Sequence, residues 1–377
     1  MKNTLKISLL LSVVLIYIGC KKAELEETEY SQSPVLPETV YDYESSNDHQ
    51  VTLGRVLFYD QKLSLNNSVS CGSCHQQSKA FCDNKQFSTG LQDQKTRRNT
   101  PSIVRHFAGF FWDSRAMDYM QLAAMPLINH VEMHNYDLTA LENKVASIGY
   151  YPQLFTNAFG SSEVTMNKIQ SAIAQFLENI DFSQNQMPNA WSSSPNTLSA
   201  MEEAGRQLFI GKAKCGNCHA GTALGGWFNS ERCIGLDESY EDNGLGERTG
   251  NPKDNGRFHI PPLFNIEYTA PYMHDGRFKT LEEVVEHYNS GIKAHPNLSI
   301  ELQSFPGYEN LSLFELTMAL DVNHNGQIDD EEVPPGTPIR MNLTELEKKS
   351  LVAFLKALSD PRIFTDVRFS DPFRIRN

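Results

Sequence analysis

Two copies of one short cysteine pattern constrain this chain more than any other feature. They are Cys71-Gly-Ser-Cys74-His75 and Cys215-Gly-Asn-Cys218-His219. A Cys-x-x-Cys-His pattern is typical of c-type haem attachment, in which two thiols bond the porphyrin and the histidine ligates the iron. A redox dithiol or a zinc site explains the cysteines, but not a histidine directly after both pairs. The sequence therefore predicts two covalently bound haem c groups.

The chain is long and acidic. It has 377 residues, with 33 Lys and Arg against 46 Asp and Glu, which gives a formal net charge of −13. This length suffices for two or three compact domains, and a content of 40% hydrophobic residues excludes a largely disordered chain. Binding to nucleic acid is not expected, because it needs a concentrated basic surface. A basic partner, such as a small electron-carrier protein, is favoured electrostatically.

The N-terminus is typical of an export signal. Lys2 and Lys6 precede an apolar run over residues 7–18, which ends at Gly19-Cys20. Residues 1–20 resemble a bacterial lipoprotein signal, which would leave a lipidated Cys20 at the periplasmic face of a membrane. The alternative is an ordinary signal peptide that contains a cysteine. Residues 21–50 are rich in Glu, Ser, Thr and Pro, which predicts a flexible tether.

Helical patterns dominate the rest of the chain. Apolar residues recur at helical spacing over residues 165–180 and 344–358. Ser199, Thr280 and Thr344 each stand three residues before a glutamate, which predicts capping boxes that open helices. Runs with a period of two are scarce. We therefore expect an all-α protein.

Each haem pattern lies near the start of a region long enough for a helical haem domain. A stretch rich in Ser, Pro and Asn, residues 192–196, marks the expected boundary. The prediction is an N-terminal domain over residues 51–195 and a C-terminal domain over residues 196–377. Cys82 and Cys233 remain outside the haem patterns. A disulfide between them is compatible with an exported protein, but the sequence does not give their separation.

Several segments carry a more specific signal. In chain order they are Leu53-Gly-Arg-Val-Leu-Phe-Tyr-Asp60, the first haem pattern, Ala80-Phe-Cys-Asp83, Arg98-Asn-Thr-Pro101, Trp112-Asp-Ser-Arg115, Pro126-Leu-Ile-Asn-His-Val-Glu-Met133 and Thr269-Ala-Pro-Tyr-Met-His-Asp-Gly-Arg-Phe278. Together they resemble the bacterial di-haem cytochrome c peroxidase family, including its MauG-type branch. The resemblance extends from about Val51 to about Leu358. It implies two cytochrome c-like haem domains packed against each other.

The resemblance also implies that the two haems have different functions. The N-terminal haem would be peroxidatic, with an iron position open for hydrogen peroxide, and the C-terminal haem would be six-coordinate and transfer electrons. Glu132 matches the family's catalytic glutamate, which moves protons during O–O cleavage, although a glutamate alone is more often a surface charge. Burial beside the porphyrin is expected to raise its pKa. Trp112 matches the tryptophan between the haems, although tryptophan is more often a plain core residue.

Two positions depart from the family pattern near the first haem. Many members have a histidine that blocks the first iron in the resting enzyme, and this chain has Leu91 at that position. Because leucine cannot ligate iron, we expect a peroxidatic haem that is five-coordinate or water-bound and needs no reductive activation. Leu122 stands where the family often has a glutamine that supports the catalytic glutamate.

The distal ligand of the second haem distinguishes the branches of the family. Classical members have a methionine where this chain has Tyr288, as in the MauG-type branch. An anionic phenolate lowers the potential of the iron, whereas a thioether raises it. We favour Tyr288 as the ligand. Met273 is the alternative ligand, and Tyr288 would then be an ordinary buried tyrosine.

Calcium is predicted at two places. The family resemblance implies an ion between the domains, held by oxygen atoms of Asn99, Thr269 and Pro271. Independently, residues 321–332 reproduce the pattern of an EF-hand loop, which predicts a structural calcium ion rather than a sensor. The expected ligands of this second ion are Asp321, Asn323, Asn325, Gln327 and Glu332. The alternative for this segment is a polar turn without metal.

These features predict an exported, lipid-anchored di-haem peroxidase that reduces hydrogen peroxide to water with electrons from an external donor, such as a small cytochrome c. One alternative is a MauG-type oxidase that acts on a partner protein through high-valent haem. Another is a non-enzymatic di-haem electron carrier, in which both irons are saturated by protein ligands and Glu132 has no role. Family members are often homodimers, but nothing in this chain identifies a dimer face.

Overall fold

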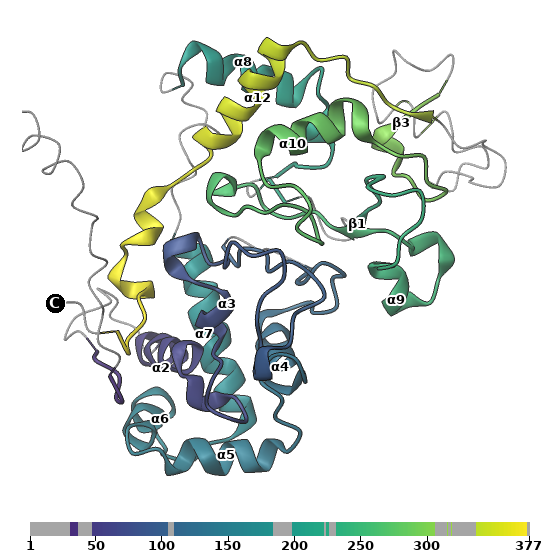
Figure 1. Ribbon diagram of the computed structural model, residues 1–377. Helices are drawn as coiled ribbons and strands as arrows, with labels where there is room; N and C mark the ends of the chain where they lie inside the picture. Colours follow the sequence, from purple (N-terminus) through teal and green to yellow (C-terminus); the bar gives the residue numbers. More distant parts are fainter. Residues whose placement is uncertain are drawn as a thin grey trace, which may run out of the picture.

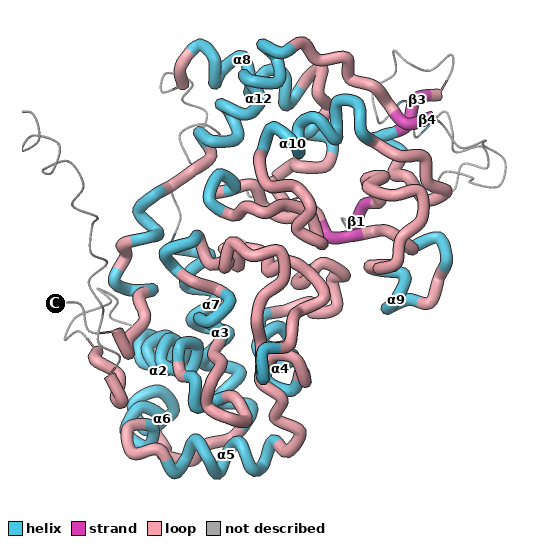
Figure 2. Tube along the Cα trace, viewed as in Figure 1, coloured by secondary structure: helices cyan, strands magenta, loops and turns pink. Residues whose placement is uncertain are grey.

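The computed structural model describes residues 31–36, 47–104, 109–183, 198–221, 224–225, 231–305, 315, 318 and 337–374. Three predicted features lie outside these residues: the export signal with Cys20, the boundary stretch at 192–196, and the EF-hand-like loop with its five ligands. Within the described residues the chain is mostly helical, as Figures 1 and 2 show. A mostly helical fold is therefore confirmed, although the expected all-α protein also has four two-residue strands among the described residues.

The first half of the chain forms one group of helices. Its α-helices are α2 (Asn47–Tyr59), α3 (Cys71–Cys74), α4 (Tyr119–Ile128), α5 (Leu138–Ser147), α6 (Tyr151–Phe159) and α7 (Met166–Ser183). Its short 3₁₀ helices are η1 (Gln61–Leu63), η2 (Gln77–Lys79) and η3 (Leu91–Asp93). The long helix α7 covers the segment predicted from apolar spacing, and it packs against α2 and α4.

The second half forms another group, which includes the shortest elements. Its helices are α8 (Ala200–Ile210), α9 (Leu245–Thr249), α10 (Leu281–Glu286) and α12 (Glu345–Ala357), with the turns η5 (Cys215–Asn217), η6 (Pro252–Asp254), η7 (Ile266–Tyr268), η8 (His287–Gly291) and η9 (Ile300–Leu302). Strand β1 (Glu231–Arg232) pairs antiparallel with β2 (Phe258–His259), and β3 (Gln303–Ser304) pairs antiparallel with β4 (Thr337–Pro338). The predicted capping boxes at Ser199, Thr280 and Thr344 are present and open α8, α10 and α12.

A glycine allows one close helix crossing in each group. On α2, a Cβ atom at Gly54 would collide with the carbonyl oxygen of Ala172 on α7. On α8, a Cβ atom at Gly205 would collide with the carbonyl oxygen of Ser350 on α12. Both glycines stand in the same local sequence, Gly-Arg-x-Leu-Phe. Each half of the chain therefore has a close helix crossing at the glycine of the same local sequence.

A phenylalanine pair lies beside each of these crossings. The rings of Phe58 and Phe176 have centroids 5.2 Å apart, and those of Phe209 and Phe354 are 5.3 Å apart. The first pair belongs to one buried hydrophobic core and the second pair to another. Because closely packed aromatic rings bury large apolar areas, these pairs anchor the two cores.

The last described residues return to the first core. They include the 3₁₀ helices η10 (Pro361–Phe364) and η11 (Val367–Phe369), which in Figure 1 run down toward α2. The buried guanidinium of Arg55 donates to the carbonyl oxygen of Ser370 at 2.6 Å, and Phe369 and Phe373 are buried in the first core. The segment expected to form the C-terminal domain, residues 196–377, therefore ends on the N-terminal half.

A short N-terminal segment binds the same end of the chain. The backbone N–H groups of Ser31 and Val35 donate to the carbonyl oxygens of Phe373 and Pro372, each at 2.7 Å. Helix α2 also begins inside the expected tether, residues 21–50. The structure differs from the prediction here, because a polar composition does not reveal backbone pairing with residues more than three hundred positions away.

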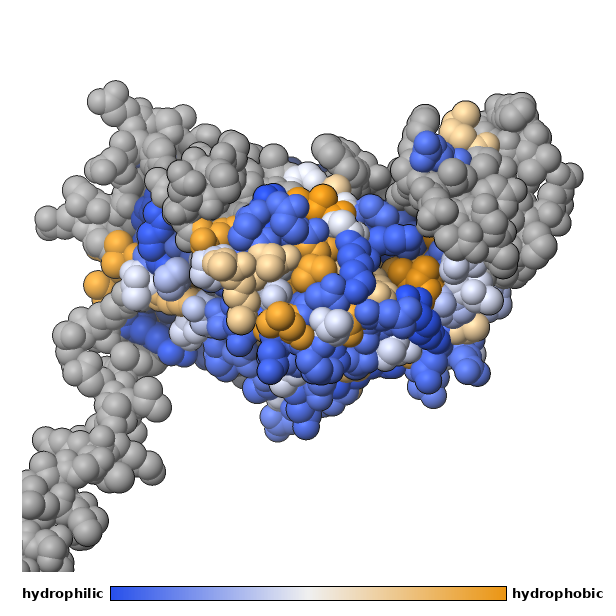
Figure 3. Space-filling view, turned by 90° about the horizontal axis from the view of Figure 1, so that it is seen from above, coloured by the Kyte–Doolittle hydropathy of each residue, from blue (hydrophilic) through white to orange (hydrophobic). Residues whose placement is uncertain are grey.

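The surface near α8 and α12 mixes polar and apolar side chains. Met201, Ile210 and Leu346 are 46%, 50% and 65% exposed. Figure 3 looks down on the molecule from above and shows apolar residues interspersed with hydrophilic ones. None of the helices in the described part of the chain is both long and apolar enough to span a membrane.

Candidate active site

The first Cys-x-x-Cys-His pattern folds as the helical turn α3, and His75 ends that turn. The His75 backbone N–H donates to the carbonyl oxygen of Cys71 at 2.8 Å. Its ring Nδ1 lies 2.8 Å from the carbonyl oxygen of Phe81, so Nδ1 carries the proton and Nε2 is left free for a metal. Burial lowers the pKa of His75, which favours the neutral imidazole that binds metals.

The second pattern is built in the same way around η5. The His219 backbone N–H donates to the carbonyl oxygen of Cys215 at 2.9 Å, and its ring Nδ1 lies 2.7 Å from the carbonyl oxygen of Leu224. Burial lowers the pKa of His219 to about 4. Both histidines are therefore neutral and oriented by a backbone carbonyl, as a metal-binding histidine requires.

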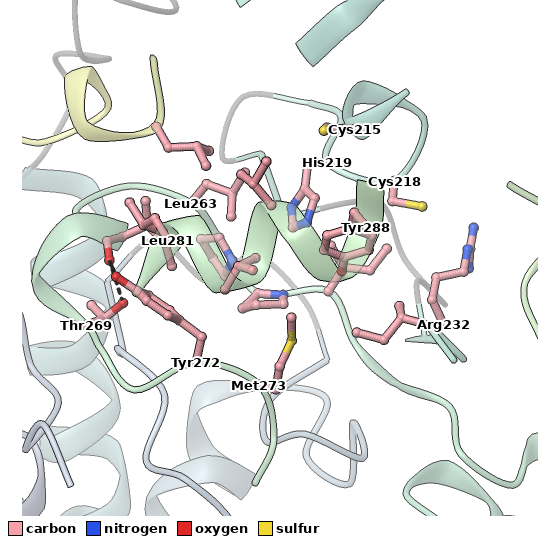
Figure 4. Close-up of a pocket in the computed structure, with 18 of the residues that line it drawn as sticks. Cys215, Cys218, His219, Arg232, Leu263, Thr269, Tyr272, Met273, Leu281 and Tyr288 are labelled. Atoms are coloured by element: carbon pink, nitrogen blue, oxygen red, sulfur yellow. Dashed lines mark hydrogen bonds between the residues drawn. The ribbon is translucent and has the colours of Figure 1, made fainter. Parts of the chain in front are cut away.

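Each pattern opens onto a cavity. The first cavity has a volume of about 450 Å³ and is lined by Cys71, Cys74, His75, Trp112, Arg115 and Glu132, among others. The second has a volume of about 190 Å³ and is lined by Cys215, Cys218, His219, Trp112, Met273 and Tyr288, among others (Figure 4). All four motif cysteines are free thiols. Free thiols and an oriented imidazole beside a largely apolar cavity fit a covalently bound haem at each site.

Glu132 lies in the wall of the first cavity, as predicted for the acid/base residue. It stands on a tight turn, where its backbone N–H donates to the carbonyl oxygen of Asn129 at 3.1 Å. Burial raises the pKa of the Glu132 carboxyl group, and the positive charge of Arg115 opposes that rise. A carboxyl group with a raised pKa is suited to exchange protons closer to neutral pH.

Arg115 belongs to an ion network that spans the two halves of the chain. Its Nη1 donates to both carboxylate oxygens of Asp113, at 3.0 and 3.2 Å, and its guanidinium lies 3.6 Å from the ring centroid of Phe111. Asp113 also accepts from Arg98 at 2.6 Å, and Arg98 donates two hydrogen bonds to Asp242 in the second half, at 2.7 and 2.8 Å. The charge beside Glu132 is therefore held in place from both halves.

Trp112 lies in a wall shared by the two cavities, since it lines both of them. Its edge also faces the imidazole of His274, with ring centroids 6.5 Å apart. The indole therefore lies between the two candidate haem sites. The role of Trp112 as an electron relay stays a prediction.

The two departures from the family pattern lie close to this cavity. Leu91 is buried, and its backbone N–H donates to the carbonyl oxygen of Val131 at 2.7 Å, on the turn that carries Glu132. Leu122 lines the cavity wall. Neither side chain can ligate iron or donate a hydrogen bond.

Met273 and Tyr288 both point into the second cavity in Figure 4. Tyr288 stands on η8, a π-helical turn that directly follows α10, the helix that the predicted capping box at Thr280 opens. Such π turns recur at functional sites because they redirect side chains. Burial raises the pKa of the Tyr288 phenol, so its anion forms only where a cation compensates the charge.

The three residues expected to bind the interdomain calcium, Asn99, Thr269 and Pro271, also line the second cavity. The side-chain amide of Asn99 donates to the carbonyl oxygen of Lys85 at 2.9 Å, so its oxygen is the atom available to a cation. In the part of the chain that the structure describes, no three His, Cys, Asp or Glu side chains gather as a metal-binding group. A cation here would therefore rely on neutral oxygens and water.

Cys82 and Cys233 are both buried free thiols. The sulfur of Cys82 lies 2.9 Å from the carbonyl oxygen of Lys79, whereas that of Cys233 lies 3.4 Å from Nδ1 of His295. The disulfide that the sequence left open is therefore not formed.

Two cavity residues had no predicted role, although both lie within the segments that carried the resemblance. Arg115 follows Trp112 by three residues, and His130 precedes Glu132 by two. Both line the first cavity. A count of charged or titratable residues around Glu132 would have selected them, but the sequence alone does not show which of them face the cavity.

Comparisons with known proteins agree with this geometry. The family described as di-haem cytochrome c peroxidase matches residues 48–192. The cytochrome c551 peroxidase of Nitrosomonas europaea is 36% identical over 292 residues, which cover 76% of this chain and 84% of that protein. The methylamine utilization protein MauG of Methylorubrum extorquens is 30% identical over 271 residues, which cover 68% of this chain and 73% of that protein.

A solved structure shares the fold over nearly its whole length. It is a MauG-like protein associated with microbial copper homeostasis, with a TM-score of 0.70 and 28% sequence identity. The match covers 93% of this chain and 99% of that one.

Proposed function

This chain belongs to the di-haem cytochrome c peroxidase family, and we propose that it reduces hydrogen peroxide to water with electrons from an external donor protein. The observation that carries the proposal is the first cavity, where the oriented imidazole of His75 and the carboxyl group of Glu132 line the same space. A haem bound there would supply the iron on which the O–O bond is cleaved. The protein supplies the axial ligand and a proton-transfer group.

The proposed arrangement has one haem in each half of the chain. Cys71, Cys74 and His75 would hold the peroxidatic haem, and Cys215, Cys218 and His219 would hold the electron-transfer haem. Each attachment site adjoins its own hydrophobic core and its own glycine-dependent helix crossing. This repetition supports two cytochrome c-like domains, with the C-terminal residues 361–374 added to the first.

Glu132 is proposed to move the protons of the reaction. Cleavage of peroxide requires removal of a proton from the bound oxygen and delivery of a proton to the leaving oxygen. A carboxyl group whose pKa is raised by burial can accept the first proton and release it again. Because Leu91 replaces the residue that often blocks the first iron, this site is proposed to be open in the resting oxidised protein.

Electrons are proposed to pass from the donor to the second haem and then through Trp112 to the first. The place of Trp112 in both cavity walls supports this route. Tyr288 is the proposed distal ligand of the second haem, because the π turn η8 directs it into that cavity.

The remaining proposals concern the surroundings of the enzyme. Asn99, Thr269 and Pro271 are proposed to bind a calcium ion, and the EF-hand-like loop a second one. The N-terminal sequence supports export as a lipoprotein to the periplasmic face of a bacterial membrane. The acidic chain favours a basic donor, such as a small cytochrome c. The family resemblance also supports a homodimer.

The experiment that tests the proposed function compares two variants of the haem-loaded protein. Glu132→Gln keeps the size of the side chain and removes its acid/base chemistry, so kcat for peroxide with a reduced cytochrome c is expected to fall by roughly 10²–10⁴-fold. Glu238→Gln changes an exposed glutamate in the second half and is the control. Full turnover in Glu132→Gln would contradict the proposed role, and slow wild-type turnover with oxidation of a partner protein would indicate the MauG-type alternative.

A further inference from the structure

Proton supply to the first cavity is a separate requirement of peroxide reduction. Each peroxide that is converted to two waters consumes two electrons and two protons, and the protons come from bulk water. Glu132 lies in the cavity wall, and burial of its carboxyl group raises its pKa. A group that both lines the cavity and reaches solvent is placed to recharge it.

Three residues that line this cavity are also exposed to solvent: Arg97, His130 and Glu247. Two of them are paired with each other, since Nη1 of Arg97 donates to a carboxylate oxygen of Glu247 at 2.9 Å. Arginine does not release its proton, and the carboxylate of Glu247 is already engaged by Arg97. An imidazole can accept a proton on one ring nitrogen and release one from the other, so His130 is the member of this set suited to relay protons.

The local backbone fixes His130 and Glu132 relative to each other. The side-chain oxygen of Asn129 accepts from the backbone N–H of Val131 at 2.9 Å, and its carbonyl oxygen accepts from Glu132 at 3.1 Å and from His134 at 2.9 Å. These three hydrogen bonds close a tight turn over residues 129–134. Both ends of the expected proton path therefore stand on one rigid turn and line one cavity.

Other charged and titratable groups face the same space. They are His75, Arg97, Arg98, Asp113, Arg115 and Glu247. His134, on the turn itself, lies beside His130 with ring centroids 6.5 Å apart. The aspartate and the glutamate in this set are engaged with arginines, and His75 is oriented by the Phe81 carbonyl, so these groups have other partners.

We propose that His130 takes up protons from bulk water and passes them to the carboxylate of Glu132. One proton moves in each transfer, and two transfers accompany each peroxide. His130 acts through Glu132 and does not itself touch peroxide. This inference rests on the proposed function, because it assigns a proton source to the same site.

The test uses the haem-loaded full chain and measures kcat for peroxide reduction by a reduced cytochrome c between pH 5 and 9, because the two protons from bulk water are consumed together with the two donor electrons. In His130→Gln we expect this rate to fall by about tenfold, with the largest loss at neutral and alkaline pH. Addition of MES, a buffer acid too bulky to ligate the iron, is expected to restore much of the rate. His134→Gln, which changes the neighbouring ring, is the matched control and is expected to keep the wild-type rate.

The outcomes separate this proposal from the proposed function. A wild-type protein that does not react with peroxide would contradict the function itself. A reactive wild type with an unchanged His130→Gln variant, or a slow variant that MES does not restore, would overturn the role of His130. A resting spectrum that changes from low-spin to high-spin in His130→Gln would also overturn it, because His130 would then be an iron ligand.

Discussion

The indole Nε1 of Trp112 donates a 2.8 Å hydrogen bond to the backbone carbonyl oxygen of Asn99. Both residues line both cavities, and the backbone N–H of Asn99 donates to the carbonyl oxygen of His274 at 2.7 Å. Asn99 thus connects the indole in the first half of the chain to a segment of the second half. The orientation of the proposed electron relay depends on this connection.

Replacement of Trp112 by Phe tests that relay. The substitution keeps an aromatic ring, but it removes both the hydrogen bond to Asn99 and the readily oxidised indole. We expect full haem content and a fall of about tenfold in kcat, equivalent to about 1.4 kcal/mol in the barrier. The fall in kcat is measured as steady-state turnover of peroxide with a reduced cytochrome. Tyr136→Phe, at a position 79% exposed, is the control. Equal turnover in all three proteins would show that electrons take another route.

We expect Arg115 to influence the pH dependence of the reaction through the pKa of Glu132. Burial raises the pKa of Glu132 and Arg115 lowers it, so removal of the cation leaves the effect of burial unopposed. The pKa then rises, and a higher pH is needed to form the carboxylate that accepts the first proton. In Arg115→Met we expect the acidic limb of the pH profile of the peroxide reaction to move to higher pH.

Arg115→Lys retains the positive charge and is the matched variant for this experiment. We expect its acidic limb to stay closer to that of the wild type. A shift of the limb to lower pH in Arg115→Met would contradict the assignment of that limb to Glu132.

The glycine at the crossing of α8 and α12 predicts a stability effect. In Gly205→Ala the new Cβ meets the backbone of Ser350, which cannot move without separating the helices. Overpacking of this kind costs about 1–3 kcal/mol in the free energy of unfolding. Denaturant unfolding followed by circular dichroism measures the loss. Gly149→Ala is the control, because a Cβ there meets nothing within 4 Å. Equal stability of the two variants would show that α12 can move away from α8 to accommodate the new Cβ without a loss of stability.

Helix positions were predictable because their signals are local. The reciprocal hydrogen bonds of a capping box need only a residue and its third neighbour, so Ser199, Thr280 and Thr344 identified three helix starts correctly. The haem patterns were equally local. In contrast, the return of the C-terminus to Arg55 joins residues 315 positions apart, and no short pattern encodes such a contact.

The site was predictable only in part for a similar reason. The resemblance selected Glu132 and Trp112, and the structure places each in a cavity wall. The neighbours that tune them, Arg115 and His130, became apparent only when the cavity brought them together. The π turn at Tyr288 was also missed, because its helical spacing is indistinguishable from that of a regular helix over so few residues.

The distal ligand of the second haem is decided by two matched variants. Tyr288→Phe removes the hydroxyl group and keeps the ring, whereas Met273→Leu removes the thioether and keeps most of the volume. The buried phenol gives up its proton only to a compensating cation such as ferric iron, so ligation by Tyr288 fixes an anionic ligand there. We expect Tyr288→Phe to abolish the six-coordinate spectrum of the second haem and to raise its reduction potential. Met273→Leu is expected to leave both unchanged. The opposite pattern, measured by absorbance and redox titration of the two haem-loaded variants, would assign the ligand to Met273.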